Sequence, residues 1–156
     1  MGIKVRFAPS PTGFLHVGGL RTALFNYLYA KKAGGQIVLR IEDTDQSRKV
    51  DNAVENLVST FEKLNIIYDE GPNHAGEAGP YFQSQRINIY NKYIDLLLKN
   101  GNAYPCFCSE DDLAAARAKQ VKEKQTIKYS RICLKLNQEE ALDRMKSEKY
   151  VIRMKV

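Results

Sequence analysis

The stretch VRFAPSPTGFLHVGGLRTALFNYLYAKKAGG, residues 5–35, most constrains how this chain can fold. Its first part is a short apolar segment that ends at Pro9, which is typical of a buried strand. Prolines, glycines and one histidine follow, and then a pattern of helical spacing. The apolar positions of that pattern are i, i+3, i+4, i+7 and i+8: Leu20, Ala23, Leu24, Tyr27 and Leu28. The stretch therefore predicts a strand, a glycine-rich turn and a helix.

A second strand is predicted directly after this helix. Gly34 and Gly35 are suited to end the helix, and residues 36–43 (QIVLRIED) are apolar at four positions. A strand, a turn, a helix and a second strand within about 40 residues predict a βαβ unit with parallel strands.

Two more helices are predicted in the first hundred residues, separated by a Gly- and Pro-rich loop. The first covers residues 51–65 and has its apolar face at Val54, Leu57, Val58, Phe61 and Leu64. The second covers residues 84–99 and is expected to point these side chains inward: Ile87, Tyr90, Ile94, Leu97 and Leu98.

The composition changes near residue 100, where we place a boundary between a domain of residues 1–100 and one of residues 101–156. The second domain is expected to contain a helix from about Glu110 that is capped by Ser109. A further helix is expected where Asn137 and Glu140 have capping-box spacing, and a strand at residues 150–156.

Composition predicts an ordinary globular protein, with 44% hydrophobic and 27% charged residues in a chain of 156. No apolar run of about 18 residues is present, and the N-terminus has no secretory or transit signal, so we expect a cytoplasmic protein without a membrane partner.

The positive charge of the chain is concentrated in residues 101–156. These residues hold 12 Lys and Arg against 8 Asp and Glu, so they carry most of the net charge of +6. Composition alone leaves open whether this surplus is a solvated face or binds a polyanion.

The glycine-rich turn has the chemistry of an anion site. Free N–H groups and the dipole at a helix N-terminus favour phosphate, and glycines allow close approach to the backbone. The turn contains neither the dinucleotide-binding G-x-G-x-x-G nor a P-loop. The residues alone therefore leave open a phosphate site or a tight turn that requires glycine.

The sequence RFAPSPTGFLHVGG at 6–19, together with RIEDTD at 40–45, resembles the glutamyl-tRNA synthetase family of the class I aminoacyl-tRNA synthetases. His16 to Gly19 (HVGG) matches this family's variant of the His-Ile-Gly-His signature. YDEGP, GPYFQSQR and GNAYPCFC resemble further family blocks in the same order, although Tyr68 stands where many relatives have Trp. The resemblance covers essentially the whole chain.

This resemblance implies an α/β fold: the first half of a Rossmann-type nucleotide-binding catalytic domain, then the start of an inserted α+β acceptor-binding (connective) domain. It implies ATP-dependent activation of L-glutamate to glutamyl-adenylate and transfer to the 3′ end of tRNA(Glu), with Mg²⁺ accompanying ATP. The family's second signature, Lys-Met-Ser-Lys-Ser, does not occur here. We therefore expect an incomplete piece of a longer, monomeric enzyme that is inactive by itself.

The resemblance also implies the roles of individual residues. Glutamate would be held by Arg6 at its side-chain carboxylate, and by the Ala8 backbone, Ser10 and Glu42 at its α-ammonium. A planar guanidinium suits a carboxylate, and Glu42 ends a predicted strand, where ligands of α/β sheets lie. His16, Gly18 and Gly19 would be the catalytic residues. The ATP-binding set would be Pro9, Ser10, Thr12, Gly13, His16, Gly18 and Gly19.

Three cysteines form a candidate zinc site. Cys106, Cys108 and Cys133 fall where many family members bind structural zinc, but Lys135 occupies the position of the usual fourth ligand. Tyr129 is the candidate fourth ligand, because a short paralogue group pairs Cys-x-Cys with Tyr-x-x-x-Cys. Three buried cysteines without metal are the alternative. His74 has no partner at ligand spacing and is expected on the surface.

Two other functions remain open at this point. One is the paralogue that joins glutamate to a modified base (queuosine) of tRNA(Asp), and the other is a non-catalytic zinc-containing RNA-binding module.

The basic segment at 117–131 (RAKQVKEKQTIKYSR) is expected to lie along the phosphates of a tRNA acceptor stem, with a solvated helix as its alternative.

Overall fold

The structure is a computed structural model that describes residues 2–156. The chain forms two compact units, the first ending at Ile89 and the second beginning at Tyr90. This division falls within helix α3 (Ile87–Lys99). The domain division that we place near residue 100 rests on composition and stays a prediction.

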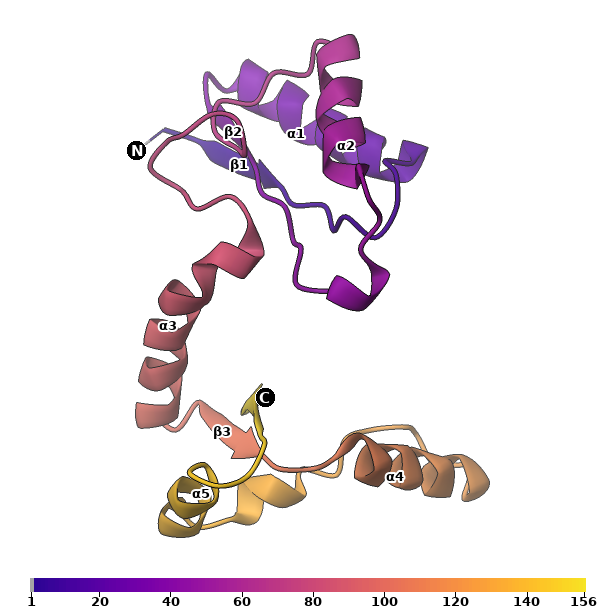
Figure 1. Cartoon of the computed structure of the whole chain (residues 1–156), viewed down its shortest axis with the longest axis vertical. Helices are drawn as coiled ribbons and strands as arrows, with labels where there is room; N and C mark the ends of the chain where they lie inside the picture. Colours follow the sequence, from indigo (N-terminus) through magenta and orange to yellow (C-terminus); the bar gives the residue numbers. More distant parts are fainter. Residues whose placement is uncertain (1) are drawn as a thin grey trace. The chain divides into compact units, whose positions relative to one another are not determined.

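The first unit is built on the βαβ arrangement that the sequence predicts. Strand β1 (Lys4–Phe7) pairs in parallel with β2 (Gln36–Leu39), and helix α1 (Val17–Lys32) connects them (Figure 1). Helix α2 (Ala53–Lys63) and the short 3₁₀ helices η1 (Gln46–Arg48) and η2 (Gln83–Arg86) follow. Helix α1 begins three residues before the first predicted apolar position.

The core of this unit lies between the two strands and helices α1 and α2. The buried side chains include Phe7, Ile37, Leu39 and Ile41 from the sheet region, Ala23 and Ala30 from α1, and Leu57 and Phe61 from α2.

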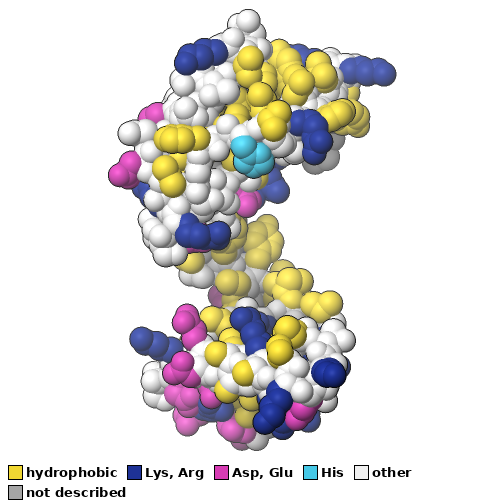
Figure 2. Space-filling model, turned by 90° about the vertical axis from the view of Figure 1, so that its right-hand side faces the viewer, with side chains coloured by type: hydrophobic (Ala, Val, Ile, Leu, Met, Phe, Trp, Pro, Cys, Tyr) yellow, Lys and Arg dark blue, Asp and Glu magenta, His cyan; other side chains and the backbone are white. Residues whose placement is uncertain are grey.

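The predicted apolar face of α1 is partly wrong. Leu20, Ala23 and Tyr27 do pack against the core, but Leu24 and Leu28 are exposed. The small side chains of Ala23 and Ala30 let the helix lie close to the strands, and this places Leu24 and Leu28 outside. Figure 2 shows hydrophobic side chains on the surface of this unit, in keeping with the exposure of Phe25 and Tyr29.

The second unit contains a two-stranded antiparallel sheet. Strand β3 (Ala103–Cys106) pairs with β4 (Val151–Met154), and Cys106 lies opposite Val151. Between the strands lie α4 (Glu110–Lys122), η3 (Ile132–Lys135) and α5 (Gln138–Arg144). Ser109 caps α4, as predicted, and it does so in a capping box with Asp112. The Asn137 side chain accepts a hydrogen bond from the Glu140 N–H at the start of α5.

Helix α3 contributes no fully buried side chain, so its predicted inward face is wrong in part. Ile87 is exposed, while Tyr90, Ile94, Leu97 and Leu98 are only half-buried. Among residues 2–156, none of the helices combines the length and the apolar character that a membrane crossing requires.

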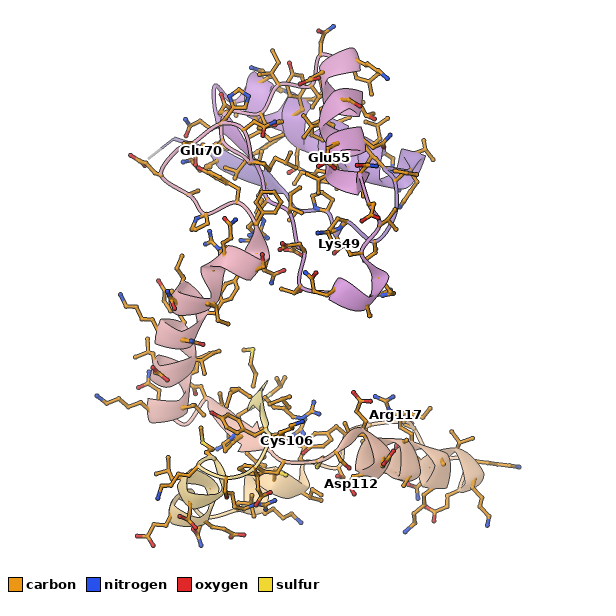
Figure 3. The ribbon with its side chains drawn as sticks, in the orientation of Figure 1. Lys49, Glu55, Glu70, Cys106, Asp112 and Arg117 are labelled. Atoms are coloured by element: carbon orange, nitrogen blue, oxygen red, sulfur yellow. The ribbon has the colours of Figure 1, made fainter. Side chains whose placement is uncertain are left out.

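A buried carboxylate fixes the loop that follows α2. The backbone of this loop bonds to the β2 region, with Leu39 N–H donating to the Glu70 carbonyl and Ile41 N–H to the Tyr81 carbonyl, both at 2.8 Å. The side chain of Glu70, which Figure 3 labels, is buried. It accepts hydrogen bonds from Lys4 Nζ, the Tyr81 hydroxyl and the Ala78 N–H. The hydrogen bond from Lys4 has the largest effect, and together the three bonds lower the Glu70 pKa from 4.5 to about 2.

Glu70→Gln is therefore expected to loosen this loop. The lowered pKa means that Glu70 stabilises the fold fully above about pH 4.5 and loses that contribution as the pH falls toward 2. At pH 7 the Ala78 amide should exchange its hydrogen at least about tenfold faster in the variant, since a hydrogen bond to a charged group contributes about 1.5–3 kcal/mol. Glu77→Gln, an exposed change in the same loop, is the control. Equal Ala78 protection in wild type and Glu70→Gln would contradict this role.

Candidate functional site

The parallel pairing of β1 and β2 continues past the ends of both strands. The Arg40 N–H donates to the Phe7 carbonyl at 3.0 Å, and the Glu42 N–H donates to the Pro9 carbonyl at 2.9 Å. Residues 8–10 therefore lie beside residues 40–42. This brings the backbones of Ala8, Ser10 and Glu42 together at the carboxyl edge of the sheet, where open α/β sheets bind ligands.

The alternation of side chains sorts these residues by face. Phe7, Leu39 and Ile41 point into the core, so their neighbours along each strand point to the opposite face. Those neighbours include Arg6 and Ala8 from the β1 side and Arg40 and Glu42 from the β2 side. Arg6 is exposed and has no ion pair within residues 2–156, so its guanidinium is available to a ligand carboxylate.

Arg40 contacts a predicted site residue, Glu42, and the sequence reasoning missed it. Its Nη2 donates to Glu42 Oε1 at 3.0 Å, and the side chain is only 17% exposed. Its Nε is buried and has no hydrogen-bond partner among the described residues. The i, i+2 spacing of the two residues in RIEDTD was the available signal, because it places both on one face of an extended segment. Arg40 holds the Glu42 carboxylate at the edge of the sheet.

The two aspartates that follow Glu42 have structural roles. Asp43 accepts hydrogen bonds from the Ser84 N–H at 2.9 Å and from the Ser84 hydroxyl at 2.7 Å. Burial raises the Asp43 pKa, but the bonds from Ser84 outweigh it and the pKa is lowered. Asp45 caps η1 and pairs with Arg48. Of the three carboxylates in RIEDTD, Glu42 is thus the one held on the face opposite the core, beside Arg40.

His16 is the N-cap of helix α1. Its Nδ1 accepts a hydrogen bond from the Gly18 N–H at 3.1 Å, so the imidazole proton lies on Nε2. The side chain is exposed, and the first turn of α1 contains no acidic residue. A neutral His16 therefore offers an N–H donor beside a helix N-terminus whose partial positive charge is uncompensated.

Gly18 makes this position of the ring possible. A Cβ atom at residue 18 would lie 2.9 Å from Cε1 of His16, closer than Cβ atoms approach other atoms. A Cβ at Gly19 would lie 3.0 Å from a Leu15 methyl group. The predicted contact of these glycines with ATP stays a prediction, but Gly18 is required locally for the cap that His16 forms.

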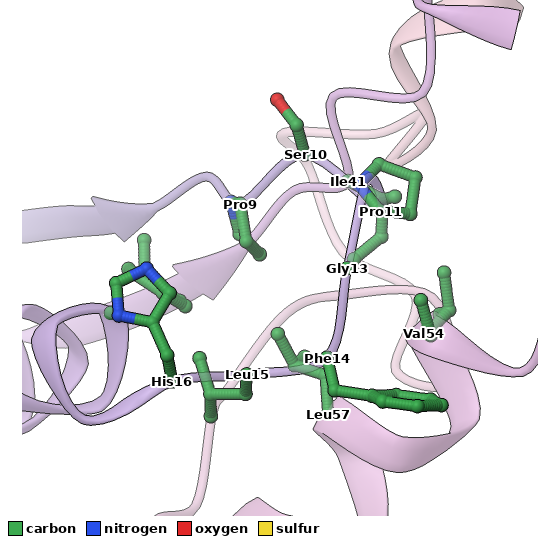
Figure 4. Close-up of a pocket in the computed structure, with 13 residues that line it drawn as sticks. Pro9, Ser10, Pro11, Gly13, Phe14, Leu15, His16, Ile41, Val54 and Leu57 are labelled. Atoms are coloured by element: carbon green, nitrogen blue, oxygen red, sulfur yellow. The ribbon is translucent and has the colours of Figure 1, made fainter. Parts of the chain in front are cut away.

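A pocket of about 200 Å³ lies beside the turn (Figure 4). One wall comes from the turn and the other from α2, with Phe7 and Ile41 also in contact. Five members of the predicted ATP-binding set line it: Pro9, Ser10, Gly13, His16 and Gly19. Thr12 and Gly18 of that set do not line it, and neither do the other residues of the predicted glutamate site. The volume is below the ~300–1,000 Å³ of most small-molecule sites, so this pocket alone would hold only part of a nucleotide.

The three cysteines lie together in the second unit. Their Sγ atoms are within 4.8 Å of one another, and Cys108 Sγ lies 3.7 Å from Cys133 Sγ. The Tyr129 hydroxyl lies 2.9 Å from Cys106 Sγ and 3.6 Å from Cys108 Sγ. Tetrahedral zinc with bonds of about 2.3 Å to sulfur places its sulfur ligands roughly 3.8 Å apart. The spacing fits one zinc ion, with Tyr129 where a fourth ligand would lie.

The surroundings of the cluster change the acidity of its members. Burial raises the Cys106 pKa, but the hydrogen bond with Tyr129 and the guanidinium of Arg153 outweigh burial and lower it to about 7. Burial raises the pKa of Cys108 and, together with the bonds to the thiols, that of Tyr129. No sequence pattern indicates that Arg153 lies near this cluster. His74 is exposed, packs edge-on against Tyr68 in the first unit, and takes no part in this cluster.

Comparison with known proteins assigns the fold. The model of the family "tRNA synthetases class I (E and Q), catalytic domain" matches residues 2–156. The chain belongs to this family. This match confirms the class I tRNA synthetase part of the resemblance inferred from the motifs.

Relatives named glutamate–tRNA ligase or glutamate–tRNA synthetase confirm the resemblance to the glutamyl-tRNA synthetases. A glutamate–tRNA ligase of Chlorobaculum parvum is 51% identical in an alignment 161 residues long, which covers 99% of this chain and 32% of the relative. One of Clostridioides difficile is 47% identical, over the whole chain and 34% of the relative. A glutamate–tRNA synthetase structure from Elizabethkingia anophelis matches 99% of the chain and 33% of its own, with a TM-score of 0.91 and 39% identity. The chain spans about a third of the length of these relatives.

Gly18→Ala is expected to displace the His16 ring, because the new methyl group would overlap Cε1. The imidazole ¹⁵N resonances should report a hydrogen-bonded Nδ1 in the wild type and lose that signature in the variant. Gly13→Ala is the matched control, since a Cβ there meets nothing within 4 Å. If both variants keep the wild-type His16 spectrum, the Gly18–His16 contact does not set the ring position.

Proposed function

We propose that the protein is a glutamate–tRNA ligase. In this reaction the glutamate carboxylate attacks the α-phosphorus of ATP, pyrophosphate leaves, and the acyl group passes from the adenylate to the 3′ end of tRNA(Glu), releasing AMP. The observation that carries the proposal is that Arg6 and Glu42 share one face of the paired β1 and β2 segments, while the turn after β1 leads to a helix capped by His16. Relatives named glutamate–tRNA ligase at about 50% identity support it.

Glutamate would bind by charge matching. The exposed Arg6 guanidinium would take the side-chain carboxylate through paired N–H donors. The α-ammonium would lie against the Glu42 carboxylate, the Ala8 carbonyl and the Ser10 hydroxyl. Arg40 already bonds one Glu42 oxygen, which leaves its second oxygen for the substrate.

ATP would lie along the turn formed by the predicted set, which includes Pro9, Thr12 and Gly13 besides His16, Gly18 and Gly19. The N-terminus of α1, with no acidic side chain in its first turn, suits phosphate. His16 would donate its Nε2–H to a phosphate oxygen, where negative charge increases as the α-phosphorus is attacked. Mg²⁺ bound with ATP would neutralise part of the phosphate charge.

We further propose a structural zinc ion in the second unit, held by Cys106, Cys108, Cys133 and Tyr129. The spacing of the donor atoms and the burial of two of the thiols support this set. On this proposal, residues 101–156 begin the acceptor-binding insertion of a Rossmann-type catalytic domain formed by residues 1–100. The basic segment 117–131 would contact tRNA phosphates, although Figure 2 shows acidic and basic side chains intermixed on one face of this unit.

One observation favours a second candidate, the paralogue that attaches glutamate to queuosine in tRNA(Asp). Tyr129 reaches the cysteines as the paralogue's Tyr-x-x-x-Cys pattern requires. Charging assays with tRNA(Glu) and tRNA(Asp) separate the two, and we expect glutamate on tRNA(Glu).

His16→Ala in the full-length protein tests the proposed function. We expect glutamate-dependent exchange between ATP and pyrophosphate to fall by about 10²-fold or more, because a donor to the transition state is lost. Glutamate binding should barely change, since His16 lies outside the glutamate set. His74→Ala removes the other histidine, an exposed one, and should leave exchange intact. Near-normal exchange by His16→Ala would remove His16 from the mechanism.

Metal analysis tests the zinc proposal. Protein purified without chelator should hold about one zinc ion per chain, with Zn–S distances of about 2.3 Å and a shorter oxygen ligand near 2.0 Å by X-ray absorption. Cys108→Ser should loosen residues 103–135 in hydrogen exchange and leave the β1–α1–β2 region unchanged. Less than about 0.2 zinc per chain, with three freely reactive thiols, would rule out the site.

A further inference from the structure

Arg153 lies against the cysteine cluster in a way that its sequence position does not suggest. It belongs to β4 and pairs with Tyr104 of β3, two residues before Cys106. The guanidinium carbon lies 4.2 Å from the centre of the Tyr129 ring. Its Nε is buried and has no hydrogen-bond partner among the described residues. The side chains of Arg153, Tyr129 and Cys108 also line one common cavity.

The charge of the proposed site calls for such a cation. Three thiolates around Zn²⁺ leave one excess negative charge, and an ionised phenol would add another. Excess charge next to buried groups is costly unless a counter-charge lies close by. The three thiols lie close together, with Cys106 and Cys133 buried, so nearby solvent offsets this charge only in part.

A second arginine of this unit provides a comparison. Arg144 stacks on the Phe107 ring, also at 4.2 Å, and faces the cluster from the Cys133 side. However, both oxygens of Glu148 accept its hydrogen bonds at 2.8 Å. The charge of Arg144 is therefore matched by a carboxylate, whereas no carboxylate within residues 2–156 forms an ion pair with Arg153.

We propose that Arg153 is a positioning residue of the zinc site, acting through Tyr129. Its planar guanidinium lies over the phenol ring and holds the hydroxyl toward Cys106 and Cys108, while its charge offsets the excess negative charge of the ligands. The inference rests on the zinc proposal above. A lysine would supply the charge without the planar stacking surface, so the two contributions are separable.

The pairing of β3 with β4 places Arg153 beside Tyr129. Tyr129 lies in the segment between α4 and η3, where its hydroxyl approaches the thiols and its ring stacks with this guanidinium. The register Tyr104↔Arg153 fixes the backbone from which the guanidinium extends. Zinc retention is thereby linked to a strand that follows the last cysteine by eighteen residues, beyond the segment that contains the ligands.

The test compares zinc affinity in the full-length protein by competition with a chromophoric chelator. Arg153→Gln should weaken zinc binding by about 10–100-fold, the range for residues that orient metal ligands. Arg153→Lys should lie between this variant and the wild type. Arg144→Gln, which removes the other stacked arginine, should change the affinity less than about threefold. Hydrogen exchange of β3 and β4 checks that each variant keeps the strand pairing.

Coordination through Tyr129 gives a second readout. Arg153→Gln should shift the visible absorption of the Co²⁺-substituted protein toward that of Tyr129→Phe, which a change in packing alone would not do. If Arg153 acts through Tyr129, a variant that combines Arg153→Gln with Tyr129→Phe should bind zinc about as weakly as whichever single variant has the lower zinc affinity. Additive losses would contradict action through Tyr129.

Two results overturn the inference and differ from each other. If the wild type binds zinc but Arg153→Gln binds it within twofold of wild type, Arg153 has no role and the zinc site stands. If the wild type itself does not bind zinc, the site and the role of Arg153 fail together.

Discussion

The parallel hydrogen bonding between the β1 and β2 segments is the constraint on which the candidate site depends. The ladder extends beyond the strands through the Phe7–Arg40 and Pro9–Glu42 backbone bonds. Because side chains alternate along both segments, burial of Phe7 and Leu39 on one side commits Arg6 and Glu42 to the other. A slip of one residue would exchange the faces and bury these charges. The hydrophobic core thus determines which side chains are presented to a ligand.

Helix α1 depends on the same pairing, because a parallel βαβ connection carries the chain from the carboxyl edge of the sheet back to its amino edge, where β2 begins. Its N-terminus lies at the carboxyl end of β1, where His16 caps it and Gly18 leaves space for the ring. The Ser84–Asp43 bonds tie the segment after the Glu70 loop to this same edge. These contacts come from different parts of the first unit and meet near the carboxyl edge of the sheet.

The sequence predicted the local features well. The βαβ order, the Ser109 and Asn137 caps and the proximity of three cysteines all depend on short-range patterns or on strong family motifs. Its errors concern packing. Leu24 and Leu28 have helical spacing but lie outside the core, because Ala23 and Ala30 form the contact with the strands. Ile87 also has the right spacing and is exposed.

Long-range partners could not be predicted from spacing. Arg153 meets Tyr129 only because β4 pairs with β3, and nothing in YVIRMKV marks that arginine. Arg40 stands beside Glu42 in the sequence, yet its role depends on both residues lying on the face opposite the core. Such contacts follow from tertiary pairing, and the residue types alone are equally compatible with a solvated surface.

A structure of the full-length protein with bound L-glutamate tests the central claim most directly. The claim is that the shared face of β1 and β2 binds the amino acid by charge matching. It predicts the side-chain carboxylate of glutamate at about 2.7–2.9 Å from the Arg6 guanidinium, with the α-ammonium against Glu42. Glutamate bound without contact to either Arg6 or Glu42 would contradict it.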